Sequence, residues 1–211
     1  MYLAVSGNIG VGKSTIVSLL AQEYGLTPVY EAVDENPYLE DFYRDMPRYA
    51  FHSQMFFLAK RLKQHLELVN PGNRIIQDRT VYEDADVFAR NLYDEGVMDR
   101  RDYGSYTLMV TAIKQALRPP DLLLYLRASL PTLRQRIALR GRSYESAISD
   151  GYLLRLNALY DHFIAQYDLS EVVVIDADDL DIVGRPGDRR RLLAMLAPYG
   201  LARPIFSYDA G

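Results

Sequence analysis

Short apolar runs alternate along the chain with longer segments in which apolar residues recur every three to four positions. The short runs predict buried β-strands, and the longer segments predict amphipathic helices. The predicted strands are residues 2–6, 27–31, 74–78, 121–126 and 172–176. The predicted helices are residues 13–24, 36–69 with a break at Pro47, 80–94, 100–117, 130–140, 150–168 and 187–197.

Strands that alternate with helices indicate a parallel sheet with right-handed crossovers and helices on both faces. Residues 122–126 and 172–175 are almost entirely apolar, which predicts strands buried on both sides. No repeat, low-complexity tract or linker interrupts the pattern. We therefore predict an α/β fold with a five-stranded parallel sheet, as one domain over residues 1–211.

Composition limits the possible partners. The 211 residues are 49% hydrophobic and 25% charged, as in an ordinary globular protein, and a net charge of −4 argues against a broad nucleic-acid-binding surface. The chain has no cysteine, no signal-like leader and no apolar stretch near the ~20 residues of a membrane span. We expect a cytoplasmic protein without nucleic-acid or membrane partners.

The most informative motif follows the first predicted strand, where the chain reads Gly7-Asn8-Ile9-Gly10-Val11-Gly12-Lys13-Ser14 before a helix that continues from Thr15. This is the G-x-x-x-x-G-K-[ST] phosphate loop in its strand–loop–helix context. Its backbone N–H groups surround the phosphates of a nucleoside triphosphate, Lys13 reaches the β- and γ-phosphates, and the Ser14 hydroxyl ligates Mg²⁺. The loop therefore predicts ATP and Mg²⁺ as cofactors in a P-loop NTPase-type three-layer sandwich.

Acidic residues stand at the ends of three other predicted strands. Glu31 ends the second strand, Asp78 ends the third before Arg79, and Asp176 ends the fifth. Ligands of open α/β sheets bind at these carboxyl ends, although a carboxylate there can also cap the next helix. For Asp176 the sequence leaves open a helix cap and a role in ordering a loop near the nucleotide.

The chain resembles the deoxynucleoside kinase family, in particular its bacterial deoxyadenosine/deoxyguanosine kinase branch. Besides the phosphate loop, four segments carry the resemblance in family order: Glu31-Ala32-Val33-Asp34-Glu35-Asn36-Pro37-Tyr38, Tyr49-Ala50-Phe51-His52-Ser53-Gln54-Met55-Phe56-Phe57-Leu58, Asp78-Arg79-Thr80-Val81-Tyr82-Glu83-Asp84 and Arg136-Ile137-Ala138-Leu139-Arg140-Gly141-Arg142. The resemblance implies phosphorylation of a deoxynucleoside 5′-hydroxyl in nucleotide salvage.

The resemblance implies that Glu31 is the general base. A carboxylate beside the phosphate loop can align a neutral hydroxyl and accept its proton. Asp78-Arg79-Thr80 stands where the family usually shows Glu-Arg-Ser, so Asp78 is expected to help position Mg²⁺ and Arg79 to hold Glu31 and the reacting phosphate. The alternatives are a solvated Glu31 and an Asp78 that only caps a helix starting near Thr80.

The resemblance also places the nucleobase among Gln54, Arg61, Asp84 and Phe88. Gln54 offers donors and an acceptor in one plane, which suits the Watson–Crick edge of a base. In the family an Arg/Asp pair at these places accompanies purine or deoxycytidine acceptance, and the Glu-Asn-Pro segment favours deoxyadenosine. The alternative is a surface ion pair of Arg61 with Asp84, and a core role for Phe88.

Sugar recognition is assigned to Tyr43, which similar bacterial sequences use for the 3′-hydroxyl. Several family members add a glutamate in the helix after the lid. The chain reads Tyr152-Leu153-Leu154-Arg155 there, without a glutamate.

An arginine-rich segment is predicted to form a lid over residues 134–150. Arg136 and Arg140 are four residues apart on one helix face, and Arg142 follows. A guanidinium neutralises phosphate charge as it spreads in the transition state, and the resemblance makes these residues the lid. The alternative is a solvated basic helix end.

Family members are usually homodimers, and one helical stripe suits a subunit contact or, equally, core packing. It consists of Leu108, Met109, Ala112, Ile113 and Ala116.

Two other functions compete with a deoxynucleoside kinase. A nucleoside monophosphate kinase such as a thymidylate kinase needs a basic group after the second strand to neutralise the acceptor phosphate. Residues 31–40 hold four acidic residues and no Arg or Lys, which argues against that class. A non-catalytic GTP-binding switch needs an N-K-x-D signature, which the chain lacks.

Overall fold

Five strands form one parallel sheet in the computed structural model, which describes residues 1–201 apart from the side chains of residues 143 and 146. The strands are β1 (Tyr2–Gly7), β2 (Thr27–Val29), β3 (Ile75–Asp78), β4 (Leu122–Arg127) and β5 (Glu171–Asp176), in the order β2-β3-β1-β4-β5. Residues 202–211 of the predicted domain lie outside the described part.

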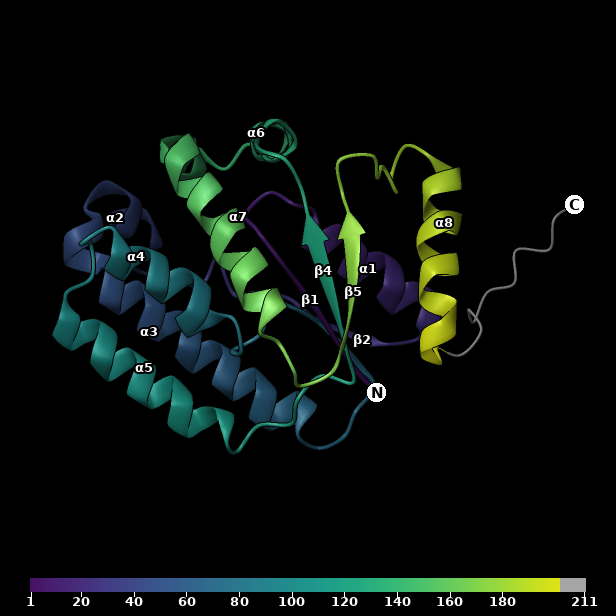
Figure 1. Cartoon of the computed structure of the whole chain (residues 1–211), viewed down its shortest axis with the longest axis horizontal. Helices are drawn as coiled ribbons and strands as arrows, with labels where there is room; N and C mark the ends of the chain where they lie inside the picture. Colours follow the sequence, from purple (N-terminus) through teal and green to yellow (C-terminus); the bar gives the residue numbers. More distant parts are fainter. Residues whose placement is uncertain (202–211) are drawn as a thin grey trace, which may run out of the picture.

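Helices cover both faces of the sheet (Figure 1). Helices α3, α4, α5 and α7 lie on one side, and α1 and α8 lie on the other, which confirms the predicted three-layer architecture. Their bounds are α1 (Lys13–Tyr24), α2 (Leu39–Arg44), α3 (Met46–Gln64), α4 (Arg90–Asp94), α5 (Arg100–Lys114), α6 (Leu130–Arg140), α7 (Asp150–Ala165) and α8 (Pro186–Leu196). Shorter turns are η1 (His65–Val69), η2 (Asp84–Ala89), η3 (Ser143–Ala147) and η4 (Ala197–Tyr199).

Burial follows the position of each strand. β1 lies at the centre, and every one of its residues is buried. The expectation that β5 is buried on both faces is wrong, because β5 is an edge strand that pairs only with β4 among the described strands. Val173 and Ile175 are buried, but Val174 between them is 50% exposed. β5 therefore alternates, as a half-covered strand does.

Two predicted helices differ in detail from the structure. The long segment 36–69 breaks near Pro47 as predicted, because the Asp45 side chain accepts a hydrogen bond from the Arg48 N–H and Pro47 sits in the first turn of α3. The helix predicted from residue 80 starts only at Asp84, with the π-helical turn η2 before α4. Asp78 therefore does not cap it.

The carboxyl ends of the strands face α6, at the edge of the sheet where β4 and β5 point in Figure 1. The phosphate loop follows β1 at this edge, and Arg79 follows β3. β2 ends at Val29, two residues before Glu31, so Glu31 lies in a loop rather than in the predicted strand. Within residues 1–201, no helix combines the length and apolar character needed to span a bilayer.

Candidate active site

The phosphate loop is shaped by glycines with left-handed backbone conformations. Gly10 has φ 81° and Gly12, the N-cap of α1, has φ 100°, a region that side-chain-bearing residues rarely adopt. A Cβ at Gly10 would lie 2.7 Å from Ile137 Cγ1 of α6. The loop can therefore wrap tightly at the start of α1, where the N–H groups and the helix dipole favour a phosphate.

Lys13 is buried at the base of this loop, and its Nζ donates to the carbonyl oxygens of Gly7 and Asn8, both at 3.0 Å. Burial, and next the neighbouring charge of Arg79, lowers the pKa of Lys13 to about 8. A phosphate beside Nζ would favour the charged form of this lysine.

Ser14 and Asp78 form the candidate metal site. Ser14 Oγ donates to Asp78 Oδ2 at 2.6 Å, and the buried Asp78 Oδ1 has no hydrogen-bond partner. Mg²⁺ in phosphate sites is held by one or two carboxylates, a hydroxyl and the substrate phosphates. Ser14 and Asp78 therefore supply oxygen ligands of the kind that Mg²⁺ prefers, and Asp78 Oδ1 has no other partner that would compete with the metal.

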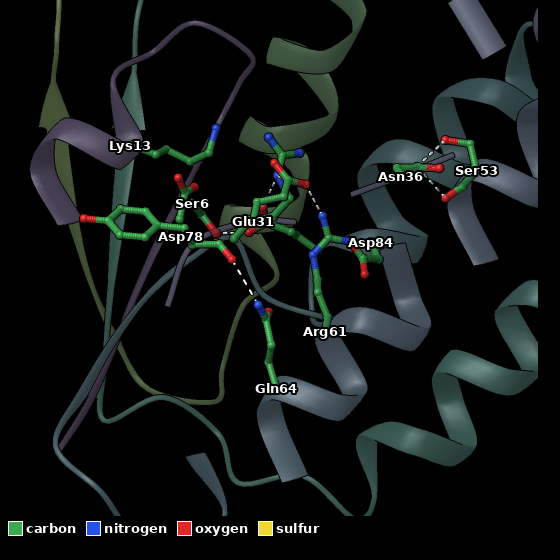
Figure 2. Close-up of polar contacts among 12 residues, drawn as sticks. Ser6, Lys13, Glu31, Asn36, Ser53, Arg61, Gln64, Asp78 and Asp84 are labelled. Carbon is green, nitrogen blue, oxygen red and sulfur yellow. Dashed lines mark hydrogen bonds and ion pairs between the residues drawn. The ribbon is translucent and has the colours of Figure 1, made fainter. Parts of the chain in front are cut away.

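Glu31, Arg61 and Arg79 form an ionic cluster, in which Figure 2 shows Glu31 beside Arg61. Arg61 Nη2 bonds Glu31 Oε1, and Arg79 Nε lies 3.2 Å from the same oxygen. Burial raises the pKa of Glu31, but Arg79, Arg61 and Lys13 outweigh burial and hold the pKa below its ordinary value. Glu31 is therefore a half-buried, ionised carboxylate held by two arginines, and not the solvated glutamate considered as an alternative.

Arg61 also binds Asp84, with 2.6 Å between Nη1 and Oδ1, so its guanidinium joins two carboxylates (Figure 2). Arg61 is 4% exposed and Asp84 is fully buried, which rules out a surface ion pair. Burial raises the pKa of Asp84, and the charge of Arg61 offsets only part of that rise. The pair is structurally costly, as expected where a buried charge serves a site.

A cavity of about 290 Å³, here called the central cavity, lies against this cluster. The predicted site residues that line it are Lys13, Ser14, Glu31, Tyr43, Gln54, Arg61, Asp78, Arg79, Phe88, Arg140 and Arg142, together with Ile9 of the phosphate loop. Asp84 does not line the cavity and is joined to it through its bond to Arg61. Helix α3 supplies Gln54 and Arg61 one above the other, as their seven-residue spacing predicts.

The lid arginines have a carboxylate partner. Arg140 binds Glu145 through Nε at 3.0 Å and Nη2 at 2.6 Å, and Arg142 Nη1 lies 3.6 Å from the same carboxylate. Tyr144 stacks on Tyr43, with ring centroids 5.6 Å apart. Arg140, Arg142 and Glu145 all line the central cavity, so the lid forms part of its wall.

Arg136 lies elsewhere, on a second cavity of about 500 Å³ beside the outer face of the phosphate loop. Its guanidinium donates to the carbonyl oxygens of Val11, Ala177 and Leu180 at 2.6, 2.7 and 2.9 Å. Asp176 orders the same turn by accepting from the Asp178 N–H at 3.0 Å. Of its two suggested roles, the loop-ordering one agrees with the structure, because the next helix starts only at Pro186.

The family model described as "Deoxynucleoside kinase" matches residues 3–197. The chain belongs to the deoxynucleoside kinase family. It is a phosphotransferase that takes its phosphate from a nucleoside triphosphate. The deoxyadenosine/deoxycytidine kinase of Bacillus subtilis is 34% identical over 92% of this chain and 91% of its own length.

Two further relatives support the assignment. The deoxyguanosine kinase of Bacillus subtilis is 31% identical over 92% of this chain and 94% of its own length. The structure of deoxyadenosine kinase from M. mycoides with bound dCTP superimposes with a TM-score of 0.82, at 34% identity, over 94% of this deoxynucleoside kinase and 100% of that chain.

Sequence reasoning missed two buried carboxylates of this deoxynucleoside kinase. Glu145 is 3% exposed and lines the central cavity with Tyr43. The lid-side glutamate was expected in the helix after the lid, which is α7, whereas Glu145 lies in η3, the turn before that helix. The available signal was an acidic residue among the lid arginines.

The second missed carboxylate is Glu83, which is fully buried and bonds Ser6 and Tyr160. No sequence pattern reveals these contacts.

Proposed function

We propose that this deoxynucleoside kinase transfers the γ-phosphate of ATP to the 5′-hydroxyl of deoxyadenosine, with deoxyguanosine and deoxycytidine as further acceptors, in nucleotide salvage. One observation carries the proposal: the ionised Glu31 lines the central cavity together with Lys13 and Ser14 of the phosphate loop. The relatives named for deoxyadenosine and deoxycytidine support these bases, as does the Glu35-Asn36-Pro37 segment.

Glu31 is assigned to orient the 5′-hydroxyl and accept its proton. A carboxylate with a low pKa is a weak base, so it does not remove the proton in advance. Phosphoryl transfer has a loose transition state, in which the oxygen becomes acidic only as its bond to phosphorus forms. A fixed, ionised carboxylate is then sufficient, and Arg61 and Arg79 keep Glu31 in that form.

The base and the sugar are assigned to opposite walls of the central cavity. Gln54 and Arg61, which Asp84 holds in place, read the polar edge of the base, and Phe88 packs against its plane. Tyr43 and Glu145 come together at the lid side and are assigned to the 3′-hydroxyl, with Glu145 in the place of the glutamate that several family members use.

The donor is assigned to the phosphate loop and the lid. Lys13 contacts the β- and γ-phosphates, and Arg140 and Arg142 exchange Glu145 for phosphate oxygens when the donor is bound. Arg136, held by three carbonyls, fixes the outer cavity where the donor base would lie. Mg²⁺, held by Ser14 and Asp78, would neutralise charge on the β- and γ-phosphates.

A homodimer is also proposed, with the five-residue stripe of α5 and the turn after it as the contact. Core packing accounts for Ile113 alone of the five, because Leu108 is 73% and Met109 44% exposed, and Ala112 and Ala116 are exposed as well. Exposed apolar groups on one helix face favour a subunit contact. Light scattering during gel filtration measures the mass directly, and a monomer at micromolar concentration would contradict the dimer.

The function is tested by phosphate transfer from γ-labelled ATP to the four deoxynucleosides and adenosine. We expect the highest kcat/KM with deoxyadenosine, lower values with deoxyguanosine and deoxycytidine, and the lowest with thymidine. A clear preference for thymidine or adenosine would contradict the proposed acceptor.

Replacing Asp78 with asparagine is expected to raise the Mg²⁺ concentration for half-maximal activity by about 10-fold, because a carboxylate near the metal is lost. The KM for the deoxynucleoside should stay unchanged, since Asp78 is not assigned to it. The matched control is Asp86→Asn, an exposed acid paired with Lys114. An unchanged Mg²⁺ dependence in Asp78→Asn would remove this residue from the metal site.

A further inference from the structure

Arg79 has a backbone conformation that its surroundings must enforce. Its φ of 65° makes it the one non-glycine residue with positive φ among the described residues, and such strain persists only where neighbouring contacts over-determine it. Its N–H donates to the Val5 carbonyl at 2.9 Å, and its Cζ lies 4.0 Å from the centre of the Phe88 ring. Of these two contacts, only the one with Phe88 involves the guanidinium itself.

Glu83 is a second carboxylate that approaches Arg79, beside the atom that faces Glu31. It follows Arg79 by four residues, and its Oε1 lies 3.9 Å from Arg79 Nε. The same oxygen accepts from the Tyr160 hydroxyl at 2.9 Å, and Oε2 accepts from the Ser6 hydroxyl. Glu83 is fully buried and does not line the central cavity, so it does not touch substrate there.

The partners of Glu83 connect three parts of the active site. Ser6 directly precedes Gly7 of the phosphate loop, Tyr160 belongs to α7 beyond the lid, and Arg79 contacts Glu31. We propose that Glu83 is a positioning residue for phosphoryl transfer, which holds Arg79 against Glu31 by tying it to β1 and α7. The proposal rests on the roles proposed above for Glu31 and Arg79.

Burying a carboxyl group costs free energy unless hydrogen bonds offset the loss of water. The hydrogen bonds of Glu83 to Ser6 and Tyr160 provide that offset. Burial raises the pKa of Glu83 to about 8, although the charges of Arg79 and Lys13 oppose the rise. Near pH 7 the group therefore mostly carries its proton, and in that form one of its two oxygens donates to a neighbouring hydroxyl while the other accepts from one. Glutamine has the same size and hydrogen-bonding reach as this neutral form, whereas alanine has neither.

The test compares Glu83→Ala with Glu83→Gln at pH 7, using ATP and deoxyadenosine. We expect Glu83→Ala to lower kcat by about 10–100-fold, because a small displacement of Arg79 misaligns the reacting groups. The KM values should stay within about twofold, since Glu83 itself does not line the central cavity. Glu83→Gln should recover kcat to within about threefold of the wild type.

Two tyrosine variants provide a matched pair that keeps the test decisive if Glu83→Ala does not fold. Tyr160→Phe removes one donor from Glu83 and should lower kcat by about 3–10-fold. Tyr125→Phe, whose hydroxyl instead bonds Asp161 and whose ring stacks on Tyr160, should leave kcat unchanged. Equal kcat values for these two variants would overturn the proposal.

Folding is checked by thermal unfolding of each variant. A folded Glu83→Ala with the wild-type kcat, or one that raises KM while kcat stays the same, would also overturn the positioning role. Transfer of phosphate to deoxyadenosine by the wild type, in the same assay, tests the proposed function separately from Glu83.

Discussion

Glu31→Gln is expected to lower kcat by about 10²–10⁴-fold, which is the range for loss of a general base. Glutamine keeps the size of the side chain and can still orient the 5′-hydroxyl, but it cannot accept the proton. The dissociation constants for ATP and the deoxynucleoside should change little, because neither ligand is assigned a contact that depends on this proton. Single-turnover kinetics and equilibrium binding separate the two effects.

The matched control for this substitution is Glu35→Gln. Glu35 lies in the same loop, is mostly exposed and pairs with Lys60 at the surface, so its loss should leave kcat unchanged. Undiminished turnover in Glu31→Gln would remove Glu31 as the base. An equal loss in both variants would indicate a general disturbance of the loop instead.

Changing Arg61 and Asp84 together to smaller apolar residues, as in Arg61→Met with Asp84→Ala, is expected to shift preference toward thymidine. The ratio of kcat/KM for thymidine to that for deoxyadenosine should rise by about 10-fold or more, because polar contacts to the purine edge are lost and an apolar methyl group is no longer opposed. The ratio is the proper readout, since Arg61 also contacts Glu31 and its loss lowers every rate.

The single variant Arg61→Met is the informative control. It leaves Asp84 without its partner in a position where the side chain is 0% exposed, and loss of one member of a buried pair costs about 3–5 kcal/mol. The double variant should be more stable than this single one in denaturant unfolding. A steady-state panel with no change in the base ratio would contradict the pocket assignment.

The fold was largely predictable because its elements are encoded locally. Apolar runs and helical periodicity located all five strands, and Pro47 located the break before α3. The exposure of Val174 was not predictable, because an apolar run looks the same in a central strand and in an edge strand. The late start of the helix after Arg79 was missed because the left-handed residue and the π-helical turn η2 leave no periodic signal.

In the candidate site, too, the residues of a contiguous motif were predictable, and those whose role depends on tertiary contacts were not. The phosphate loop is contiguous in sequence, so Lys13 and Ser14 could be assigned from the motif alone. Arg61 was assigned by resemblance, and its bridge between Glu31 and Asp84 depends on where α3 packs. Glu83 was missed because its contact with Ser6 joins residues distant in the chain. Glu145 was missed because it shares a cavity with Tyr43 only in the folded chain.

The central claim is that an uncharged sugar alcohol lies beside Glu31 and receives the phosphate. The most direct test offers deoxyadenosine and deoxyadenosine monophosphate separately as acceptors with γ-labelled ATP, and identifies the labelled product. We predict labelled monophosphate from deoxyadenosine and no labelled diphosphate from the monophosphate, because an acceptor phosphate would face the Glu31 carboxylate. Efficient formation of the diphosphate, with deoxyadenosine left unphosphorylated, would contradict this account.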